Sequence, residues 1–371
     1  MTAPTEIDQN ACRTRQQRLL GEMKKRGAGI AVLNRPESVQ WLTGARVGPL
    51  FAIAAAIDAE GAVTLVLPKR QIDAPAAADL RVAYEEKWLS TMRDASDQAA
   101  ACIGALLDNL PHASGKAACE FSVASRLLTS AWSGDWIDVD RLMFTLRRRK
   151  DPDELSMLAR ANEANRAMYQ RARDLVAPGL NELELYTELH TTAVRELGEP
   201  LTYFGQDFRC NARGGAPRDR ECQQGELYIL DLGVGYRGYY SDNARTLAVG
   251  GAPSDAQLLA WEKLQEVFAY LESTVAPGVS CKGVFEEVSA MLAGLSPWLF
   301  NHHLGHGVGL APHEAPHLNP NWDDTFQAGD FFTAEPGLYH EELRAGMRLE
   351  QNYVVTDSGV KLLTDWPLEL A

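Results

Sequence analysis

The feature that most limits how this chain can fold is an ordered set of five potential metal ligands in its C-terminal part. The set contains four carboxylates and one imidazole, in the order Asp231, Asp242, His306, Glu335 and Glu350. Such a hard, oxygen-rich set suits two octahedral divalent ions better than one tetrahedral zinc ion. Two ions that share a water would supply a hydroxide nucleophile and polarise a carbonyl group. The set therefore predicts a dinuclear metallohydrolase whose fold brings these distant positions together.

The composition argues against several other classes of protein. The chain has 371 residues, enough for two domains with separate cores, and its formal net charge of −14 opposes binding to nucleic-acid phosphates. Its longest apolar run, residues 50–57, is too short to cross a bilayer, and its first residues lack the apolar segment of a signal peptide. We expect a cytoplasmic protein that binds neither nucleic acid nor a membrane.

Residues 1–145 are predicted to form a smaller α/β domain that precedes the ligand-bearing part. Apolar periodicity predicts helices at residues 15–26 and 99–110. Short buried strands are predicted at residues 29–34, 51–57 and 62–67. None of these segments gathers reactive side chains into a cluster, so we expect the chemistry to lie in residues 146–371.

The second predicted domain begins beside the basic run Arg147–Lys150, which we interpret as a solvated surface. A helix should follow this run. Asp151 can cap that helix, Pro152 suits its first position, and Glu154 lies in its first turn.

A short sequence repeat divides the second domain. The segment 176–181 (Val-Ala-Pro-Gly-Leu-Asn) returns as residues 275–280 (Val-Ala-Pro-Gly-Val-Ser). Each copy should end one amphipathic helix and begin another, with Asn181 or Ser280 as the cap. The repeat fits either a common helix–turn–helix or two pseudo-symmetric halves that face each other across a ligand site.

The first two carboxylates are expected on neighbouring strands, at residues 226–231 and 239–249. The turn between them, residues 233–238, has the glycine spacing of a dinucleotide site, but a strand follows it instead of the required helix. The predicted hairpin places Asp231 beside Asp242. A carboxylate in an apolar strand is costly unless it is paired or metal-bound, and these two alone would also fit a salt-bridged structure.

The remaining candidates lie in a histidine-rich segment and in two apolar strands. Residues 302–309 (His-His-Leu-Gly-His-Gly-Val-Gly) place three histidines within five positions, and histidine suits proton transfer near neutral pH. Glu335 and Glu350 each follow apolar residues, where an ion pair with Arg348 is an alternative. Together with the other ligands, both glutamates are more economically explained by metal.

These motifs resemble those of the pita-bread metallopeptidases, a family that includes methionine aminopeptidase, Xaa-Pro aminopeptidase, prolidase and creatinase-like proteins. The matching motifs are Asp231-Leu232-Gly233, Ser241-Asp242, Gly305–Gly309, His313-Glu314, Ala334–Gly337 and Arg348–Glu350. The resemblance covers the whole chain, because residues 1–145 resemble the creatinase/prolidase N-terminal domain. It implies an α+β fold class, with a smaller α/β domain followed by a pita-bread fold of two pseudo-symmetric halves.

The resemblance also implies a role for each ligand. Asp231 would bind one metal bidentately, and Asp242 and Glu350 would bridge both metals. His306 and Glu335 would complete the shell of the second metal. Family enzymes use manganese, our first choice, or cobalt, iron or zinc.

The resemblance names three catalytic side chains and one orienting side chain. His302 and His313 match histidines that shuttle protons and contact the scissile group. Glu335 matches the acid/base carboxylate, which passes a proton from the water to the leaving amine. Arg348 would orient the carboxylates.

One position departs from the family pattern. A histidine that contacts substrate usually lies about 17 residues before the first aspartate ligand, and here that position is Gly214. No histidine lies between His190 and His302. Arg213 could supply a fixed positive charge there for an anionic substrate, or it could be an ordinary solvated arginine.

Three functions remain open at this point. The first is a metal-dependent exopeptidase that cleaves an N-terminal peptide bond, most readily Xaa-Pro, through a hydroxide bridging two divalent metals. The second is a hydrolase or lyase of the same fold acting on a small non-peptide substrate, which the replacement at Gly214 favours. The third is an inactive binding protein, although inactive relatives typically lose ligands that are all present here. Relatives with this N-terminal domain are often dimers, so we expect a homodimer.

Overall fold

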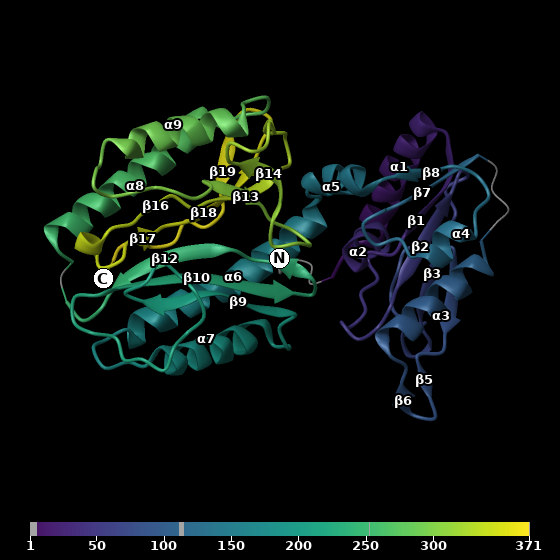
Figure 1. The fold of residues 1–371 in the computed structure, drawn as a ribbon, viewed down its shortest axis with the longest axis horizontal. Coiled ribbons are helices and arrows are strands. Elements are labelled where there is room, and N and C mark those ends of the chain that lie inside the picture. Colours follow the sequence, from purple (N-terminus) through teal and green to yellow (C-terminus); the bar gives the residue numbers. More distant parts are fainter. Residues whose placement is uncertain (1–5, 111–114, 252, 371) are drawn as a thin grey trace. The chain divides into compact units, whose positions relative to one another are not determined.

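The computed structural model describes residues 6–110, 115–251 and 253–370. These residues form two compact units, Glu6–Arg147 and a second unit that begins at Arg148 (Figure 1). The predicted boundary after residue 145 falls within helix α5 (Asp140–Arg148) and stays a prediction. Among the described residues, no helix is long and apolar enough to cross a membrane.

The N-terminal unit is built on a six-stranded mixed sheet of order β4-β3-β2-β1-β7-β8. Its strands are β1 (Ala28–Leu33), β2 (Ala54–Asp58), β3 (Val63–Pro68), β4 (Leu80–Tyr84), β7 (Lys116–Cys119) and β8 (Trp136–Asp138). Its other elements are α1 (Gln9–Arg26), α2 (Pro36–Thr43), α3 (Ala95–Leu107), α4 (Arg126–Ser130), the short hairpin β5 (Lys87–Trp88) with β6 (Thr91–Met92), and the 3-10 turn η1 (Lys69–Gln71).

The predicted helices and strands of this unit are confirmed, with shifted ends. Helix α1 begins earlier than expected because Asp8 caps it by accepting a hydrogen bond from the Asn10 amide at 2.8 Å. Ile103 and Leu106 of α3 pack with Ile30 and Val32 of β1 in one buried cluster. Ile30 and Val32 are two positions apart, so they lie on the same face of β1, the face that α3 covers.

The C-terminal unit consists of two halves, each with two helices and a sheet. The first half contains α6 (Pro152–Leu175), α7 (Glu182–Leu197), β9 (Tyr203–Cys210), β10 (Leu227–Tyr236), β11 (Tyr239–Tyr240) and β12 (Asn243–Ala248). The second half contains α8 (Asp255–Thr274), α9 (Cys281–Ala293), β13 (Gly305–Gly307), β14 (Glu314–Leu318), β15 (Phe331–Ala334), β16 (Gly337–Leu338), η2 (Glu341–Leu343), β17 (Met347–Arg348), β18 (Gln351–Val355) and β19 (Val360–Leu362).

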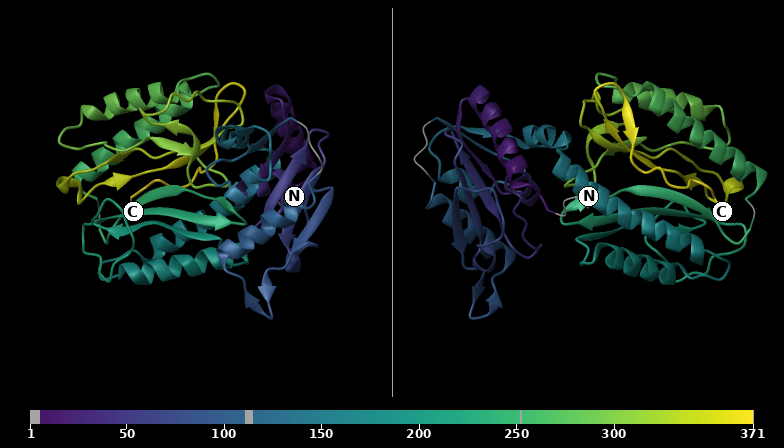
Figure 2. Two further views of the ribbon diagram at one scale, coloured as in Figure 1. Left: turned by 45° about the vertical axis from the view of Figure 1, so that its right-hand side comes forward. Right: turned by 180° about the vertical axis from the view of Figure 1, so that it is seen from behind.

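Both sheets lie between the two pairs of helices, with α6 and α7 on one side and α8 and α9 on the other (Figures 1 and 2). The first sheet has the order β11-β10-β12, with β9 paired to β10, and the second has the order β14-β13-β15-β18-β19. The Glu350 amide donates to the Ala244 carbonyl at 3.0 Å, which joins the two halves where the ligands are expected. The α+β pita-bread architecture is therefore confirmed.

The sequence repeat marks equivalent places in the two halves. Asn181 caps α7 by accepting from the Leu183 amide at 2.9 Å, and Ser280 caps α9 by accepting from the Gly283 amide at 3.0 Å. Gly179 and Gly278 both have φ of 90°, a left-handed conformation that favours glycine. The second interpretation of the repeat, two similar halves, is the one that the structure supports.

The interpretation of the basic run as a solvated surface is wrong for Arg147, Arg148 and Lys150, which are buried, whereas Arg149 is exposed. Arg148 is 6% exposed and its guanidinium bonds the Asp330 carboxylate, with Nε 3.0 Å from Oδ1. Lys150 is 5% exposed and its Nζ lies 2.8 Å from Glu314 Oε2. Sequence alone could not show this, because both acidic partners lie more than 160 residues away along the chain.

Candidate metal centre

The first two predicted ligands do come from neighbouring strands. Asp231 lies within β10 and pairs in register with Ala244 of β12, while Asp242 lies between β11 and β12. The connection is tighter than predicted, because β10 continues to Tyr236 and only Arg237 and Gly238 make the turn. The predicted strand 239–249 is interrupted at Asp242, which lies outside the regular strands.

The other three predicted ligands come from the second sheet. His306 lies in β13 and pairs in register with Thr333 of β15, so Glu335 follows β15 close to it. Glu350 lies between β17 and β18. Potential ligand atoms of Asp231, Asp242 and Glu350 lie within 4.8 Å of one another, and Asp242, His306 and His313 form a further group by the same measure.

Each aspartate or glutamate of the first group is held through one oxygen. Arg348 Nη1 donates to Asp231 Oδ2 at 2.5 Å, and Asp231 Oδ1 is buried without a hydrogen-bond partner. The Thr333 hydroxyl donates to Glu350 Oε1, and Glu350 Oε2 is likewise without a partner. Gln206 Nε2 donates to Asp242 Oδ1 at 2.5 Å. This arrangement fixes the carboxylates and leaves oxygens available for a cation.

Burial makes these carboxylates costly to ionise without cations. None of the five predicted ligands is more than 6% exposed. Burial first, and then repulsion from neighbouring carboxylates, raises the pKa of Asp242 and of Glu350 well above the usual range. Two divalent ions would balance four carboxylates, so the donor set fits a dinuclear centre.

The surroundings of His306 favour a neutral imidazole, the form that a nitrogen ligand of a metal requires. Its Nδ1 donates to the Gly307 carbonyl at 3.0 Å, so the lone pair is on Nε2. Nε2 lies 3.6 Å from Asp242 Oδ2 and 3.5 Å from Glu335 Oε1. Burial lowers the pKa of His306 well below its usual value, which keeps the imidazole unprotonated.

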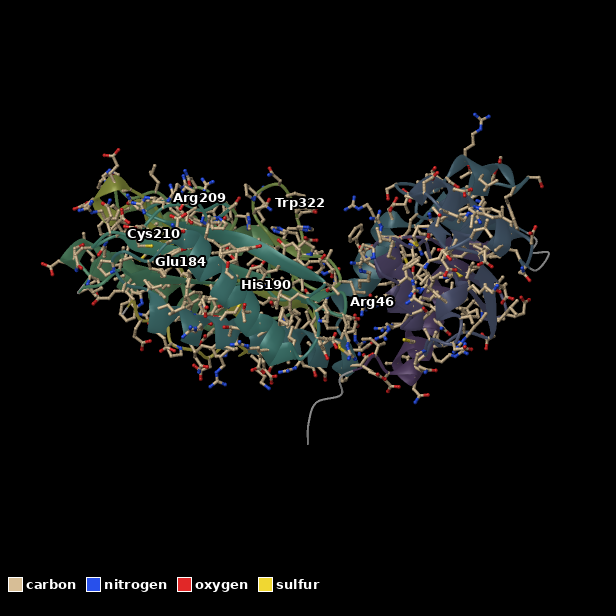
Figure 3. All side chains as sticks on the ribbon, turned by 90° about the horizontal axis from the view of Figure 1, so that it is seen from below. Arg46, Glu184, His190, Arg209, Cys210 and Trp322 are labelled. Carbon is tan, nitrogen blue, oxygen red and sulfur yellow. The ribbon has the colours of Figure 1, made fainter. Side chains whose placement is uncertain are left out.

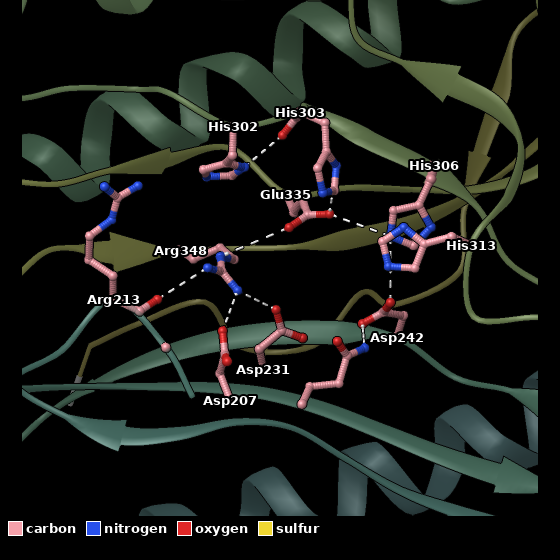
Figure 4. Close-up of a pocket in the computed structure, with 12 residues that line it drawn as sticks. Asp207, Arg213, Asp231, Asp242, His302, His303, His306, His313, Glu335 and Arg348 are labelled. Atoms are coloured by element: carbon pink, nitrogen blue, oxygen red, sulfur yellow. Dashed lines mark hydrogen bonds and ion pairs between the residues drawn. The ribbon is translucent and has the colours of Figure 1, made fainter. Parts of the chain in front are cut away.

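The other predicted catalytic side chains line the same cavity, which has a volume of about 410 Å³ (Figure 4). His302 Nδ1 lies 2.7 Å from the His303 carbonyl and its Nε2 lies 2.9 Å from the Tyr339 hydroxyl. Burial lowers the pKa of His302 to about 3. The His313 ring stacks on His306 with centroids 3.7 Å apart. All predicted site residues therefore converge, whereas His190 packs against Phe204 from helix α7 (Figure 3).

The cavity wall at Gly214 lacks the substrate-contacting histidine that the family pattern places at this position. A Cβ atom at Gly214 would lie 2.2 Å from Asp207 Oδ2, so the Asp207 carboxylate occupies the space of a side chain there. Asp207 Oδ2 accepts from Arg348 Nη1 at 2.9 Å, and its Oδ1 accepts from the Gly215 amide at 2.5 Å. Arg213 also lines the cavity, where its guanidinium lies 4.0 Å from the centroid of the Tyr339 ring.

Asp207 and His303 line the cavity and were not assigned from the sequence, and neither were Gln206, which bonds Asp242, and Tyr339, which bonds His302. Asp207 enters the site because β9 pairs with β10 in a register that sets it opposite Asp231, and no local pattern reveals that register. His303 belongs to the conspicuous histidine run, but nothing in the sequence separates its role from that of its neighbours. Its ring lies in the cavity close to Glu335 (Figure 4).

Comparison with known proteins identifies the family. Residues 156–357 match the model of metallopeptidase family M24, and residues 15–148 match the creatinase/prolidase N-terminal domain. The chain therefore belongs to metallopeptidase family M24.

Several relatives extend over nearly the whole chain. An uncharacterized peptidase of Staphylococcus aureus (strain MW2) is 27% identical over 365 residues, which cover 95% of this chain and 99% of the relative. The crystal structure of dipeptidase PepE from Mycobacterium ulcerans is 25% identical, with a TM-score of 0.77 and coverage of 98% of both chains. The prolidase from Pyrococcus horikoshii OT3 has a TM-score of 0.79 at 22% identity, covers 96% of this chain and 100% of its own, and is similar in fold.

Proposed function

We propose that the protein is a metal-dependent exopeptidase that hydrolyses an N-terminal peptide bond, with Xaa-Pro as the first substrate to test. One observation carries the proposal. The carboxylates of Asp231 and Glu350 are each fixed through one oxygen while the other is buried without a partner, and Asp242 Oδ2 lies 3.6 Å from His306 Nε2. The family supports peptide hydrolysis, and prolidases and dipeptidases are among the proteins of similar structure.

The ions held by these ligands would polarise the scissile carbonyl and lower the pKa of the attacking water. Asp231, Asp242, His306, Glu335 and Glu350 would hold two divalent ions, with manganese the first choice and cobalt, iron or zinc the alternatives. Arg348 keeps Asp231 oriented through its 2.5 Å hydrogen bond.

The chain's own side chains would then move the proton. Glu335, whose Oε1 lies 3.5 Å from His306 Nε2, would accept a proton from the water and return it to the leaving amine. His302 and His313, which line the same cavity, would contact the scissile group. His302 is oriented for this by Tyr339, whose hydroxyl donates to Nε2 and accepts from Arg348 Nε at 3.1 Å.

The alternative is a hydrolase or lyase acting on a small non-peptide substrate, and the wall at Gly214 favours it. In the occupied centre two divalent ions balance four ligand carboxylates, and Asp207 balances Arg348. Arg213 then remains as an uncompensated positive charge on the cavity wall, so a substrate with one negative charge would complement the site. The free carboxylate of a dipeptide meets this requirement, and so does a small anionic amide.

The experiment is product release from a peptide panel with added manganese. The panel contains Xaa-Pro dipeptides, Xaa-Pro tripeptides and Met-Ala peptides, with Glu350→Ala as the inactive blank. Cleavage confined to Xaa-Pro bonds would support the proposal, and the dipeptide-to-tripeptide ratio would name the subclass. No cleavage by protein that holds two metals would favour the non-peptide alternative, and protein that holds no metal would favour an inactive binding protein.

Arg213→Ala tests the charge on the wall, with Arg209→Ala as its matched control. Arg209 (labelled in Figure 3) lies on the adjoining strand β9, bonds the Ala216 carbonyl at 2.8 Å and is not among the residues that line the cavity. We expect Arg213→Ala to raise KM for substrates with a free carboxylate more than for their amides. An equal effect of both variants would mean that loosening the loop, rather than losing charge, is responsible.

A homodimer in the cytoplasm and a domain boundary after residue 145 complete the proposal.

A further inference from the structure

We infer that His303 is a sixth protein ligand of the metal centre, bound through Nδ1 to the ion held by His306 and Glu335. The inference rests on the metal centre of the proposed function, and it holds whichever substrate the enzyme cleaves. None of the roles assigned so far uses this side chain.

Donor-to-donor distances carry the inference. A metal–ligand bond of about 2.1 Å places adjacent donors roughly 3.0 Å apart in an octahedron and roughly 3.4 Å apart in a tetrahedron. His303 Nδ1 lies 3.3 Å from Glu335 Oε1, and His306 Nε2 lies 3.5 Å from the same oxygen. Ligand atoms of His303, His306 and Glu335 all lie within 4.8 Å of one another. These are the separations of donors that share one ion.

The His303 nitrogen also lacks another partner. Nδ1 is buried and has no hydrogen-bond partner, although the side chain as a whole is 34% exposed. A buried polar atom without a partner is costly, and a bound cation would remove that cost.

The backbone holds His303 in this position. The Leu304 amide donates to the Leu318 carbonyl at 2.9 Å, and the Glu335 amide donates to the Leu304 carbonyl at 2.7 Å. The carbonyl of His303 itself accepts from His302 Nδ1 at 2.7 Å. Because the residue after His303 is bonded directly to Glu335, the two side chains start from adjacent and fixed backbone positions.

A sixth ligand would make the two metal positions chemically different. The group Asp231, Asp242 and Glu350 offers only oxygen, which suits manganese or magnesium. The group His303, His306 and Glu335 offers two nitrogens and one oxygen, which suits zinc, cobalt or iron. We therefore expect the two positions to select different metals when both kinds are supplied.

The competing role for His303 is a hydrogen bond from Nδ1–H to Glu335. Loss of such a partner would also weaken metal binding by about 10- to 100-fold, so affinity alone does not separate the two roles. Direct ligation leaves a different signature. Each imidazole bound to cobalt(II) gives an exchangeable N–H proton signal shifted far outside the normal range, and an imidazole that is merely nearby does not.

The test is proton NMR of the whole chain, stripped with chelator and loaded with cobalt(II), as wild type, His303→Ala and His302→Ala. His302 is the matched control because both of its nitrogens already have partners. We expect His303→Ala to lose one exchangeable shifted signal and His302→Ala to keep all of them. His303→Gln serves if His303→Ala does not fold. An unchanged number of signals without His303 would overturn the inference while leaving the metal centre intact. A chain that binds no cobalt would contradict the centre itself.

Discussion

The close approach of Asp207 to Gly214 makes a quantitative prediction about stability. In Gly214→Ala, the new Cβ atom would lie 2.2 Å from Asp207 Oδ2 and 2.5 Å from its Cγ, well inside van der Waals contact. The Asp207 carboxylate cannot simply rotate away, because Arg348 Nη1 and the Gly215 amide hold it at 2.9 Å and 2.5 Å. Overpacking of this kind costs about 1–3 kcal/mol.

A double-mutant cycle isolates this clash. Asp207→Ala alone should cost about 1–3 kcal/mol, because it removes the acceptor of two hydrogen bonds. In Gly214→Ala with Asp207→Ala the clash is gone, so the double variant should lose about 1–2 kcal/mol less than the sum of the single variants. Any backbone strain at position 214 is present in both Gly214→Ala proteins and cancels in the cycle.

The assay is urea denaturation of the four proteins, followed by circular dichroism under one set of conditions. Losses that add to within about 0.5 kcal/mol would refute the reasoning, because non-interacting sites behave in that way. Additivity would mean that Asp207 does not occupy the space above Gly214.

Four further predictions follow from the buried charges. Burial raises the pKa of Asp242, Glu335 and Glu350. In metal-free protein the folded state therefore keeps protons on these carboxyl groups that the unfolded chain releases above about pH 4. The free energy of unfolding of the metal-free protein should fall as the pH rises. Manganese at a hundredfold excess over Kd should restore about 2.7 kcal/mol, and an unchanged melting temperature would count against the ligand set. Arg348→Gln should lower kcat with a smaller effect on KM, since Asp231 loses its orienting partner; equal changes in both parameters would point to substrate binding instead. Lys150→Met should lower the free energy of unfolding by about 3–5 kcal/mol, because the buried Glu314 carboxylate loses its ion pair with Lys150. The additional change Glu314→Gln should recover part of that loss in the same urea assay.

The sequence predicted those features that depend on local chemistry. Helix caps at Asn181 and Ser280 follow from residues within a few positions, and the order of the five ligands follows from motifs that each span only a few residues. The repeated Val-Ala-Pro-Gly segment correctly indicated two similar halves. The length of β10 was underestimated because Gly233 and Gly235, which resemble turn residues, are part of a buried strand.

Features that depend on strand register or on distant ion pairs could not be predicted. Asp207 reaches the cavity through its pairing opposite Asp231, and Arg148 and Lys150 are buried beside Asp330 and Glu314 in the folded chain. The place of His303 beside Glu335 depends on a hydrogen bond between Leu304 and Glu335, 31 residues apart by their numbers. In each case the decisive partner is remote in sequence.

The central claim is that Asp231, Asp242, His306, Glu335 and Glu350 form one centre for two divalent ions. Metal analysis after equilibrium dialysis of chelator-stripped protein against manganese tests it most directly, with Glu350→Ala dialysed in parallel. We expect two ions per wild-type chain and a loss of the dinuclear stoichiometry in the variant. A wild-type chain that retains no manganese, or a variant that retains as much as the wild type, would contradict it.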